Sequence, residues 1–474
     1  MGRMWYSQSN QDCIWGGNKL RIVILGAGKV GFTLCAQLAE EDHDVLVIDR
    51  EADKIERLVD RYDVLGITGN GATFQILTEA QVEEADIFIA VTDSDELNLL
   101  AGLLAKRLGA GNCIVRVRNP EYLEQREFMK ETMGLSMIVN PELEAAFEIR
   151  RMILFPSAVK VDTFANGRIE LAEFRITAKS SLMGKFLYQL PKLSKAKVLI
   201  CAISRQEEIL IPDGNAQLQE NDRIYVIGQH QNLVRFCRDI RLFEQKIQRV
   251  MIVGGGRIAY YLATQLAELG LTVKIIESQQ QRAQELSEKF PHLTVIHSDG
   301  SDEVVLEEEG LARMDAFVAL TGLDEENIVM SLYAKQQKVK KTIAKVTRMD
   351  FAQVLEQLAI DSVVSPKSII ANQILSYVRA KDLQDESSGV RRMYRLIHDQ
   401  VEALEFVVTE SCSFKNQPLK TLNTKENLLI AAISRGKQTI VPDGETVLRP
   451  GDHVIIVAKE EKIHSLEMIL KGTR

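Results

Sequence analysis

The chain of 474 residues repeats itself once, and this duplication constrains its fold more than any single motif. A glycine-rich segment that starts at Gly26 matches one that starts at Gly254, 228 residues later. An Ala-Ile-Ser-Arg segment that ends at Arg205 matches one that ends at Arg435, 230 residues later. Because a repeat of this length carries its fold with it, we expect two tandem copies of one structural unit.

The first part of each copy alternates short apolar runs with stretches of helical length. Such runs lie at 22–25, 45–48 and 87–91 in the first copy, and at 250–253 and 273–276 in the second. Strands that alternate with helices form β-α-β units and a parallel sheet. Each copy is therefore predicted to begin with a Rossmann-like, doubly wound α/β domain.

The remainder of each copy is richer in short β-type runs, separated by Ile-Pro-Asp-Gly or Val-Pro-Asp-Gly. Pro presets φ, Asp bonds its own backbone and Gly accepts a positive φ, so these sequences predict turns. We expect a small α+β lobe after each Rossmann-like domain. The predicted boundaries are an N-terminal extension without fixed structure (1–19), a first Rossmann-like domain (20–141), a helical connector (142–158), a first lobe (159–240), a second Rossmann-like domain (248–367), a helical connector with a linker at 382–389 (368–390) and a second lobe (391–474).

The motif Gly26-Ala-Gly-Lys-Val-Gly31 follows an expected strand and opens an expected helix, the context that dinucleotide binding requires. Gly26 permits the tight turn, Gly28 lets a pyrophosphate approach the backbone, and Gly31 allows close helix–strand packing. The helix N-terminus offers free N–H groups to phosphates. Asp49 ends the second strand, where an acid accepts hydrogen bonds from ribose hydroxyls and repels a 2′-phosphate. The motif favours NAD(H); the alternative is a bare glycine turn with a solvated Asp49.

The second copy carries the same pattern with changes. It reads Gly254-Gly-Gly256-Arg-Ile-Ala259, with alanine as an accepted third residue, and Glu277 takes the acidic position. Arg257 either neutralises a phosphate or faces solvent. A second nucleotide site is therefore expected.

Polar residues also follow the fourth strand, where ligands of open α/β sheets bind. Thr92 and Asp93 lie at this edge, and Thr321 matches Thr92 in the second copy. Either Thr92 bonds a ligand, or the segment only caps the next helix through Ser94 and Asp95. Arg116, with Lys345 as its rough counterpart, either reaches a phosphate or pairs with a structural acid.

Several classes of function lack support in the sequence. With 58 Lys and Arg against 66 Asp and Glu, the formal net charge is -8, which disfavours nucleic-acid binding. No apolar run approaches the ~20 residues of a membrane-spanning helix. The cysteines are scattered and form no Cys-x-x-Cys pair, so no metal site is expected. No histidine recurs in both copies and no catalytic residues are assigned, which favours a nucleotide sensor over an enzyme.

The tandem halves, the glycine motif, the Val-Thr-Asp-Ser-Asp-Glu-Leu-Asn segment ending at Asn98 and the Arg-Val-Arg-Asn-Pro-Glu-Tyr segment ending at Tyr122 resemble the TrkA family. The resemblance covers about residues 20–474. It implies two KTN (RCK) domains, each followed by a TrkA-C lobe. It also implies a homo-oligomeric ring (a tetramer, with a dimer as the alternative) at the cytoplasmic face of the membrane, under a potassium transporter subunit of the TrkH or TrkG type. NAD(H), with ATP or ADP as further ligands, would change the ring's shape and so gate ion flow.

The resemblance also carries nucleotide contacts onto this chain. They are Gly26, Ala27, Gly28, Lys29, Val30, Gly31, Asp49, Thr92, Asp93, Arg116, Gly254, Gly255, Gly256, Arg257, Ile258, Glu277, Thr321 and Lys345. The chain departs from the family pattern in the extension before Lys19, and in Gly322, which replaces the counterpart of Asp93. Both halves therefore need not bind one ligand equally.

Three other functions compete with this interpretation. An NAD-dependent oxidoreductase would need an acid–base group beside the nicotinamide. A Rossmann-type DNA-binding repressor would need a basic DNA-reading element. A KTN regulator of another ion transporter, such as a proton antiporter, is poorly separated from the potassium interpretation by sequence.

Overall fold

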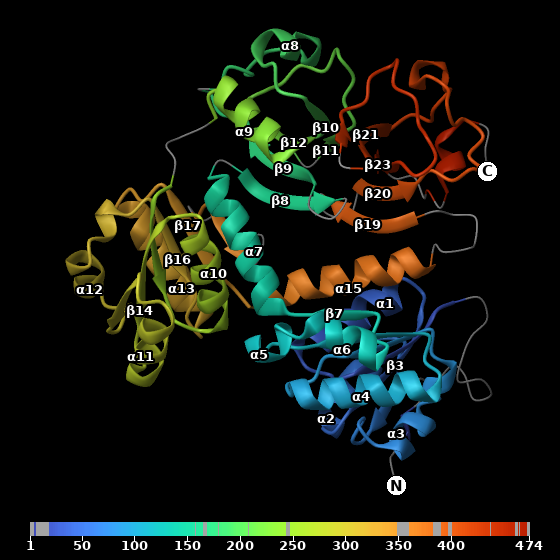
Figure 1. Ribbon diagram of the computed structural model, residues 1–474, viewed down its shortest axis with the longest axis vertical. Helices are drawn as coiled ribbons and strands as arrows, with labels where there is room; N and C mark the ends of the chain where they lie inside the picture. The colour runs from blue at the N-terminus through green and yellow to red at the C-terminus, as the bar shows by residue number, and fades with distance from the viewer. Residues whose placement is uncertain are drawn as a thin grey trace. The chain divides into compact units, whose positions relative to one another are not determined.

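The computed structural model describes residues 4–5, 19–156, 158–164, 168–178, 180–206, 208–242, 247–347, 360–382, 390–396, 401–436, 438–459, 463 and 465–471 (Figure 1). Two compact units divide the chain. The first comprises Met1–Ala145 with Ser365–Val378, and the second comprises Ala146–Val364 with Arg379–Arg474. The connector helix of the second copy thus belongs largely to the unit built around the first Rossmann-like domain.

The first unit is built on a seven-stranded sheet in the order β1-β4-β3-β2-β5-β6-β7. All neighbouring strands are parallel except β1, which pairs antiparallel with β4. The order reverses between β2 and β5, and such a switch point is where open α/β sheets bind ligands. The strands are β1 (Met4–Trp5), β2 (Arg21–Leu25), β3 (Asp44–Asp49), β4 (Leu65–Thr68), β5 (Ile87–Ala90), β6 (Asn112–Arg116) and β7 (Met137–Val139).

Helices cover both faces of this sheet. One face packs against α1 and α2, and the other against α3, α4 and α6. The first face is completed by α15 of the second copy, whose Ile370, Ile374 and Val378 are fully buried there beside α1 (Figure 1). The helices are α1 (Lys29–Glu40), α2 (Ala52–Val59), α3 (Phe74–Glu79), α4 (Asp95–Leu108), α5 (Pro120–Leu123), α6 (Arg126–Met133) and α15 (Pro366–Asp382); α7 (Pro141–Leu154) begins in this unit.

The second unit contains the second Rossmann-like domain. Its six-stranded sheet has the order β15-β14-β13-β16-β17-β18, with every neighbouring pair parallel. The strands are β13 (Arg249–Val253), β14 (Thr272–Glu277), β15 (Thr294–His297), β16 (Ala316–Ala319), β17 (Lys341–Lys345) and β18 (Ser362–Val364). Its helices include α10 (Arg257–Glu268), α11 (Gln280–Lys289), α12 (Glu303–Glu308) and α13 (Asp324–Gln336).

The two lobes in this unit are five-stranded antiparallel sheets with orders β11-β10-β12-β9-β8 and β19-β20-β23-β21-β22. Apolar residues from both lobes, among them Tyr225, Ile227, Val401 and Val457, share one buried cluster. The strands are β8 (Ala158–Phe164), β9 (Ile169–Arg175), β10 (Val198–Arg205), β11 (Glu208–Leu210), β12 (Arg223–Gly228), β19 (Val390–Leu396), β20 (Val401–Val407), β21 (Leu428–Arg435), β22 (Gln438–Ile440) and β23 (His453–Lys459). Lobe 1 also contains α8 (Leu190–Leu193) and α9 (His230–Asp239).

These sheets confirm the predicted fold class of two Rossmann-like domains, each followed by a small lobe. One expectation was wrong: Met4–Trp5, assigned to an extension without structure, extends the first sheet as β1. Residues 383–389 of the predicted linker lie outside the described residues, and the domain boundaries stay predictions. Across the described part of the chain, no helix is both long and apolar enough to cross a membrane.

Candidate functional site

The glycines of the first motif form a tight turn between β2 and α1. Gly26 has φ +109°, and a Cβ there would lie 3.0 Å from the amide nitrogen of Thr92. A Cβ on Gly31 would lie 1.8 Å from the carbonyl oxygen of Gly26, so the helix packs this closely only with glycine. At Gly28, the residue before α1, a Cβ would meet nothing within 4 Å. The turn therefore exposes backbone at the helix N-terminus, which is the approach that a pyrophosphate needs.

Asp49, at the end of β3, is tied to this turn. Its Oδ2 accepts a hydrogen bond from the amide of Ala27 at 2.7 Å, and its Oδ1 accepts one from the amide of Glu51 at 3.0 Å. Each carboxylate oxygen can accept more than one hydrogen bond. Asp49 therefore holds the turn in place and keeps the capacity to accept from ribose hydroxyls.

The second motif forms the same turn with different side chains. Gly254 has φ +98°, and Gly256 precedes α10 with open space at its Cα. Glu277 replaces Asp49, and its Oε2 accepts from the amide of Gly255 at 2.5 Å. Its Oε1 accepts from the amide of Gln279 at 2.7 Å. Each Rossmann-like domain thus has an acidic side chain that holds its glycine turn.

Arg282, which the sequence analysis did not single out, reaches the second turn from α11. Its Nε donates to the carbonyl oxygen of Gly255 at 2.8 Å. At the matching position of the first copy, Lys54 pairs with Glu51 instead, at 2.5 Å. The sequence does show a cation at this position in both copies, but it does not show which residue that cation contacts.

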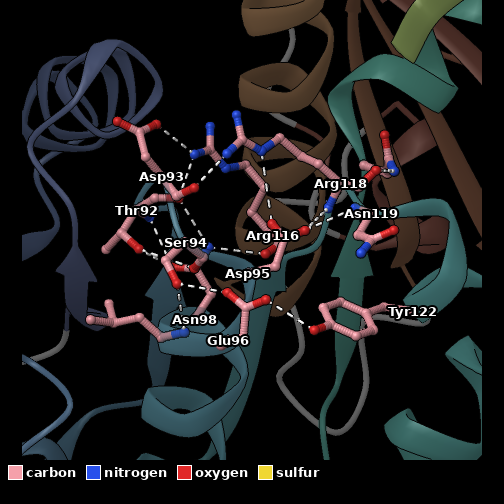
Figure 2. Close-up of polar contacts among 12 residues, drawn as sticks. Thr92, Asp93, Ser94, Asp95, Glu96, Asn98, Arg116, Arg118, Asn119 and Tyr122 are labelled. Atoms are coloured by element: carbon pink, nitrogen blue, oxygen red, sulfur yellow. Dashed lines mark hydrogen bonds and ion pairs between the residues drawn. The ribbon is translucent and has the colours of Figure 1, made fainter. Parts of the chain in front are cut away.

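Asn98 on α4 organises the ends of β5 and β6 (Figure 2). This fully buried side chain accepts from the amide and hydroxyl of Thr92 at 2.9 and 2.7 Å. Its Nδ2 donates to the carbonyl oxygens of Thr92 and Arg116, both at 3.0 Å. The side-chain amide thereby uses its full hydrogen-bonding capacity. From the sequence, Asn98 was recognised only as the last residue of a segment that resembles the TrkA family.

The expected capping of α4 is half right. Ser94 is the N-cap, and its hydroxyl accepts from the amide of Leu97 at 3.1 Å. Asp95 does not cap the helix as expected, because its carboxylate is drawn to the neighbouring strand end. It accepts from the amides of Arg118 and Asn119 at 2.9 and 2.8 Å (Figure 2).

Arg116 is buried at the end of β6, with its guanidinium directed to the loop after β5. It donates to the carbonyl oxygen of Thr92 and to Asp93 at 3.0 Å, so an acid does pair with it. Arg118 donates to the carbonyl oxygen of Asp93 beside it. Burial, followed by repulsion from Arg118, lowers the pKa of Arg116 from its ordinary value. Two guanidinium groups therefore converge near the first glycine turn.

The equivalent strand ends of the second copy keep this framework but carry different side chains at two positions, Lys345 for Arg116 and Gly322 for Asp93. Asn327 accepts from the amide and hydroxyl of Thr321, both at 2.9 Å, and donates to the carbonyl oxygens of Thr321 and Lys345 at 3.2 and 3.0 Å. Asp324 accepts from the amide of Thr347 at 2.8 Å. Gly322 offers no side chain where Asp93 stands in the first copy.

The remaining predicted contacts lie around the two turns. Lys29 and Arg257 are exposed on the first turns of α1 and α10, while Val30 and Ile258 are buried in the core below. The structure therefore groups the predicted residues of each copy at one sheet edge. Among the described residues, no three His, Cys, Asp or Glu side chains are placed to hold a metal ion.

This architecture defines a class of protein with paired Rossmann-like domains, each carrying a nucleotide-type glycine turn and an antiparallel lobe. The family model described as the TrkA-N domain matches residues 22–141 and 250–366. The TrkA-C domain model matches residues 171–241 and 403–471. The chain belongs to the TrkA family.

Relatives of known name match almost the full chain. The Trk system potassium uptake protein TrkA homolog of Archaeoglobus fulgidus is 34% identical over 453 residues, covering 95% of this chain and 100% of that protein. The Trk system potassium uptake protein TrkA of Haemophilus influenzae is 31% identical, covering 94% of this chain and 96% of that protein.

Solved structures share the fold at lower identity. The GsuK channel has a TM-score of 0.64 and 18% identity, covering 96% of this chain and 79% of that chain. The GsuK RCK domain has a TM-score of 0.63 and 18% identity, covering 96% and 94%. The GsuK channel has also been solved bound to NAD, with a TM-score of 0.63 to this chain.

Proposed function

We propose that this chain is a nucleotide-sensing regulatory subunit of a membrane potassium transport system. The observation that carries the proposal is the duplicated turn, in which Asp49 holds Ala27 and Glu277 holds Gly255 beside an open helix N-terminus. The names of the relatives, Trk system potassium uptake proteins, support the choice of potassium. The subunit acts at the cytoplasmic face of the membrane, as a homo-oligomeric ring under a transporter subunit.

The ligand in this proposal is NAD(H), with ATP or ADP as further ligands. The amides at the N-termini of α1 and α10 bind the phosphates, because they point outward and carry the positive end of the helix dipole. Asp49 and Glu277 accept hydrogen bonds from the ribose hydroxyls. Thr92 and Thr321 stand at the adjacent strand ends, held by Asn98 and Asn327.

Nucleotides act here by shifting a conformational equilibrium, and they are not consumed. A ligand moves such an equilibrium only by the difference between its affinities for the two shapes. Both acidic side chains already hold backbone amides, and this contact links nucleotide binding directly to the backbone of each turn. Oxidoreductase activity is the competing function. A change in NADH absorbance when small substrates are added would reveal it.

The first experiment is isothermal titration of the full chain with NADH, NAD, ATP and ADP, beside Asp49→Ala. We expect micromolar binding that falls by about tenfold or more at one of two sites, since a charged acceptor is lost. Asp53→Ala is the matched control, because it removes the same charge from an exposed position on α2. Binding that is equal in both variants, or nucleotides that leave potassium flux through a reconstituted transporter unchanged, would refute the proposal.

A further inference from the structure

The sheet of the first lobe is covered differently on its two faces. Side chains alternate along β12, so Tyr225 and Ile227 belong to the cluster shared with the second lobe, whereas Ile224 and Val226 face the other way. On that opposite face the sheet packs against α8 and α9, for example through Leu233. The outer surface of α8, α9 and the loop after α8 therefore lies on the side of the first lobe away from the second lobe (Figure 1).

This outer surface is rich in positive charge. Two hydrogen bonds hold its segments together: the hydroxyl of Ser194 donates to Asp239 at 2.7 Å, and the amide of Lys197 donates to the side chain of Asn232 at 3.4 Å. Asp239 is the one acid in residues 190–197 and 230–241. The exposed cations of the two segments, which we call the cationic surface, are Lys192, Lys195, Lys197, Arg235, Arg238 and Arg241.

Most of the cationic surface is not neutralised by neighbouring acids. Arg235 lies 3.8 Å from Asp239, a long distance for an ion pair. Within the described ranges of the chain, the three lysines of the surface form no ion pair. The whole chain has a formal net charge of -8, so this face is opposite in sign to the molecule that carries it.

The second lobe keeps the backbone of this region but balances its charges. The amide of Tyr188 donates to the carbonyl oxygen of Gly214, and the amide of Lys420 donates to that of Gly444, so Lys420 stands at the position of Tyr188. The lysines in this region of the second lobe are paired: Lys420 with Glu445 at 2.5 Å, Lys415 with Glu410 at 3.0 Å and Lys471 with Glu426 at 3.0 Å. The fold of the lobe therefore does not require a cationic surface.

Exposed apolar side chains border the cationic surface. Tyr188 is 58% exposed and Met183 is 41% exposed, both on the loop before α8. The amide of Ser181 donates to the carbonyl oxygen of Ile240 at 3.3 Å, which places this loop beside the end of α9. Long cationic side chains next to an exposed tyrosine suit the headgroup region of a bilayer, where charged tips meet phosphates and the ring lies in partly apolar surroundings.

We propose that the cationic surface of the first lobe binds the anionic phospholipid headgroups of the membrane. Each Lys or Arg near an anionic leaflet strengthens binding by about fivefold, so several cations act together without a shaped pocket. The net negative remainder of the chain is repelled by the same leaflet, which selects this face. An acidic protein segment would pair with the cations but would give Tyr188 and Met183 no apolar partner. The inference rests on the proposed position of the subunit at the membrane and adds a direct lipid contact to it.

The test measures cosedimentation of the full chain with vesicles of phosphatidylcholine alone and of phosphatidylcholine with equimolar phosphatidylglycerol. The unaltered chain should prefer the mixed vesicles, and added salt should weaken this binding by screening. The triple variant Lys192→Gln, Lys195→Gln, Lys197→Gln should bind the mixed vesicles about 100-fold more weakly, since three cations are lost. Arginine at the same three positions keeps the charge and should keep the binding, which separates loss of charge from misfolding.

The matched control removes the same charge from the second lobe. Lys415→Gln, Lys420→Gln, Lys471→Gln should bind the mixed vesicles as the unaltered chain does, because those lysines are already paired. Equal losses in the two triple variants would show that binding follows net charge alone, and would overturn the inference.

Two further outcomes would overturn it. One is an unaltered chain with no preference for the mixed vesicles. The other is binding only to neutral vesicles that contain the transporter subunit, lost in the first triple variant, which would identify an acidic protein partner. Nucleotide titration is a separate measurement, so a failure of nucleotide binding would refute the proposed sensing function and leave the vesicle result unchanged.

Discussion

The carboxylate of Glu277 occupies the space that a side chain at residue 255 would need. A Cβ on Gly255 would lie 2.9 Å from Oε2 of Glu277 and 2.5 Å from a methyl carbon of Leu286. In the first copy the shorter Asp49 makes the same contact to Ala27, at 2.7 Å. Both copies therefore make the same contact with residues of complementary size. Gly255 faces the longer acid, Glu277, and the larger Ala27 faces the shorter acid, Asp49.

Gly255→Ala should accordingly destabilise the second Rossmann-like domain by about 1–3 kcal/mol, because the new methyl group overpacks the turn. Adding Glu277→Asp should restore part of that loss by recreating the pair found in the first copy. Urea unfolding followed by fluorescence measures both changes. Gly256→Ala is the control, since a Cβ there meets nothing within 4 Å. A double variant no more stable than Gly255→Ala would show that the two volumes are not coupled.

Asn98→Leu should destabilise the first site by more than the change in side-chain size alone would. It leaves the amide and carbonyl of Thr92 and the carbonyl of Arg116 without their buried partner. An unsatisfied buried group costs about 1–3 kcal/mol, so we expect a clear fall in thermal stability and at least a tenfold loss of nucleotide affinity.

Asn327→Leu is the matched change in the second copy. Each variant should weaken one of the two sites and spare the other, as read by titration. Unchanged affinity in a folded Asn98→Leu protein would mean that Thr92 and Arg116 do not contact the ligand.

The buried amino group of Lys341 should make the stability of the protein depend on pH. Burial lowers the pKa of this fully buried lysine to about 8; Asp361 opposes the shift and Lys335 adds to it. Its Nζ donates to the carbonyl oxygens of Pro156 and Ala158, both at 3.1 Å. Between pH 8 and the ordinary value of 10.5, the unfolded chain binds more protons than the folded one, so this group makes stability rise with pH.

The full cost of burying the charge, about 3 kcal/mol, therefore applies below pH 8 and disappears towards pH 10.5. Lys341→Met should remove this rise, which is read as the difference in urea midpoint between variant and unaltered chain across that range. Parallel pH profiles for the two proteins would indicate that Lys341 titrates at its ordinary pKa when folded.

The features that were predicted correctly from the sequence are those that depend on the local pattern of residues. The strands around both turns and the glycine positions follow from apolar runs and backbone geometry, and β2, β3 and β5 lie within one residue of the predicted ranges. β8 and β9 were not predicted, because charged residues such as Lys160, Asp162 and Glu170 break up the continuous apolar runs by which the other strands were recognised.

The parts of the site that were not predicted from the sequence depend on contacts between residues far apart in the chain. An amphipathic pattern shows that α15 buries one face, but not that it does so against the first sheet. In the same way, the sequence places Asn98 on a helix and Arg282 near an acid without giving their partners. Hydrogen bonds across 18 to 27 residues, such as Asn98 to Arg116 and Arg282 to Gly255, require the folded sheet.

The repeated Ala-Ile-Ser-Arg segments yield a last prediction, because each arginine neutralises a buried aspartate in its lobe. Arg205 donates to both carboxylate oxygens of Asp222 at 2.7 Å, and Arg435 does the same to Asp452 at 2.8 and 2.7 Å. The side chain of Asp222 is 0% exposed. Removing one partner of a buried pair costs about 3–5 kcal/mol, since the other charge is left uncompensated.

Arg205→Ala should therefore destabilise the first lobe strongly, and adding Asp222→Asn should recover part of the loss by removing the stranded charge. The same pair of changes at Arg435 and Asp452 should repeat the result in the second lobe. Differential scanning calorimetry of the single and double variants measures the coupling. Additive losses would mean that Asp222 is stabilised by its backbone contact with Gln219, at 2.7 Å, and not by the arginine.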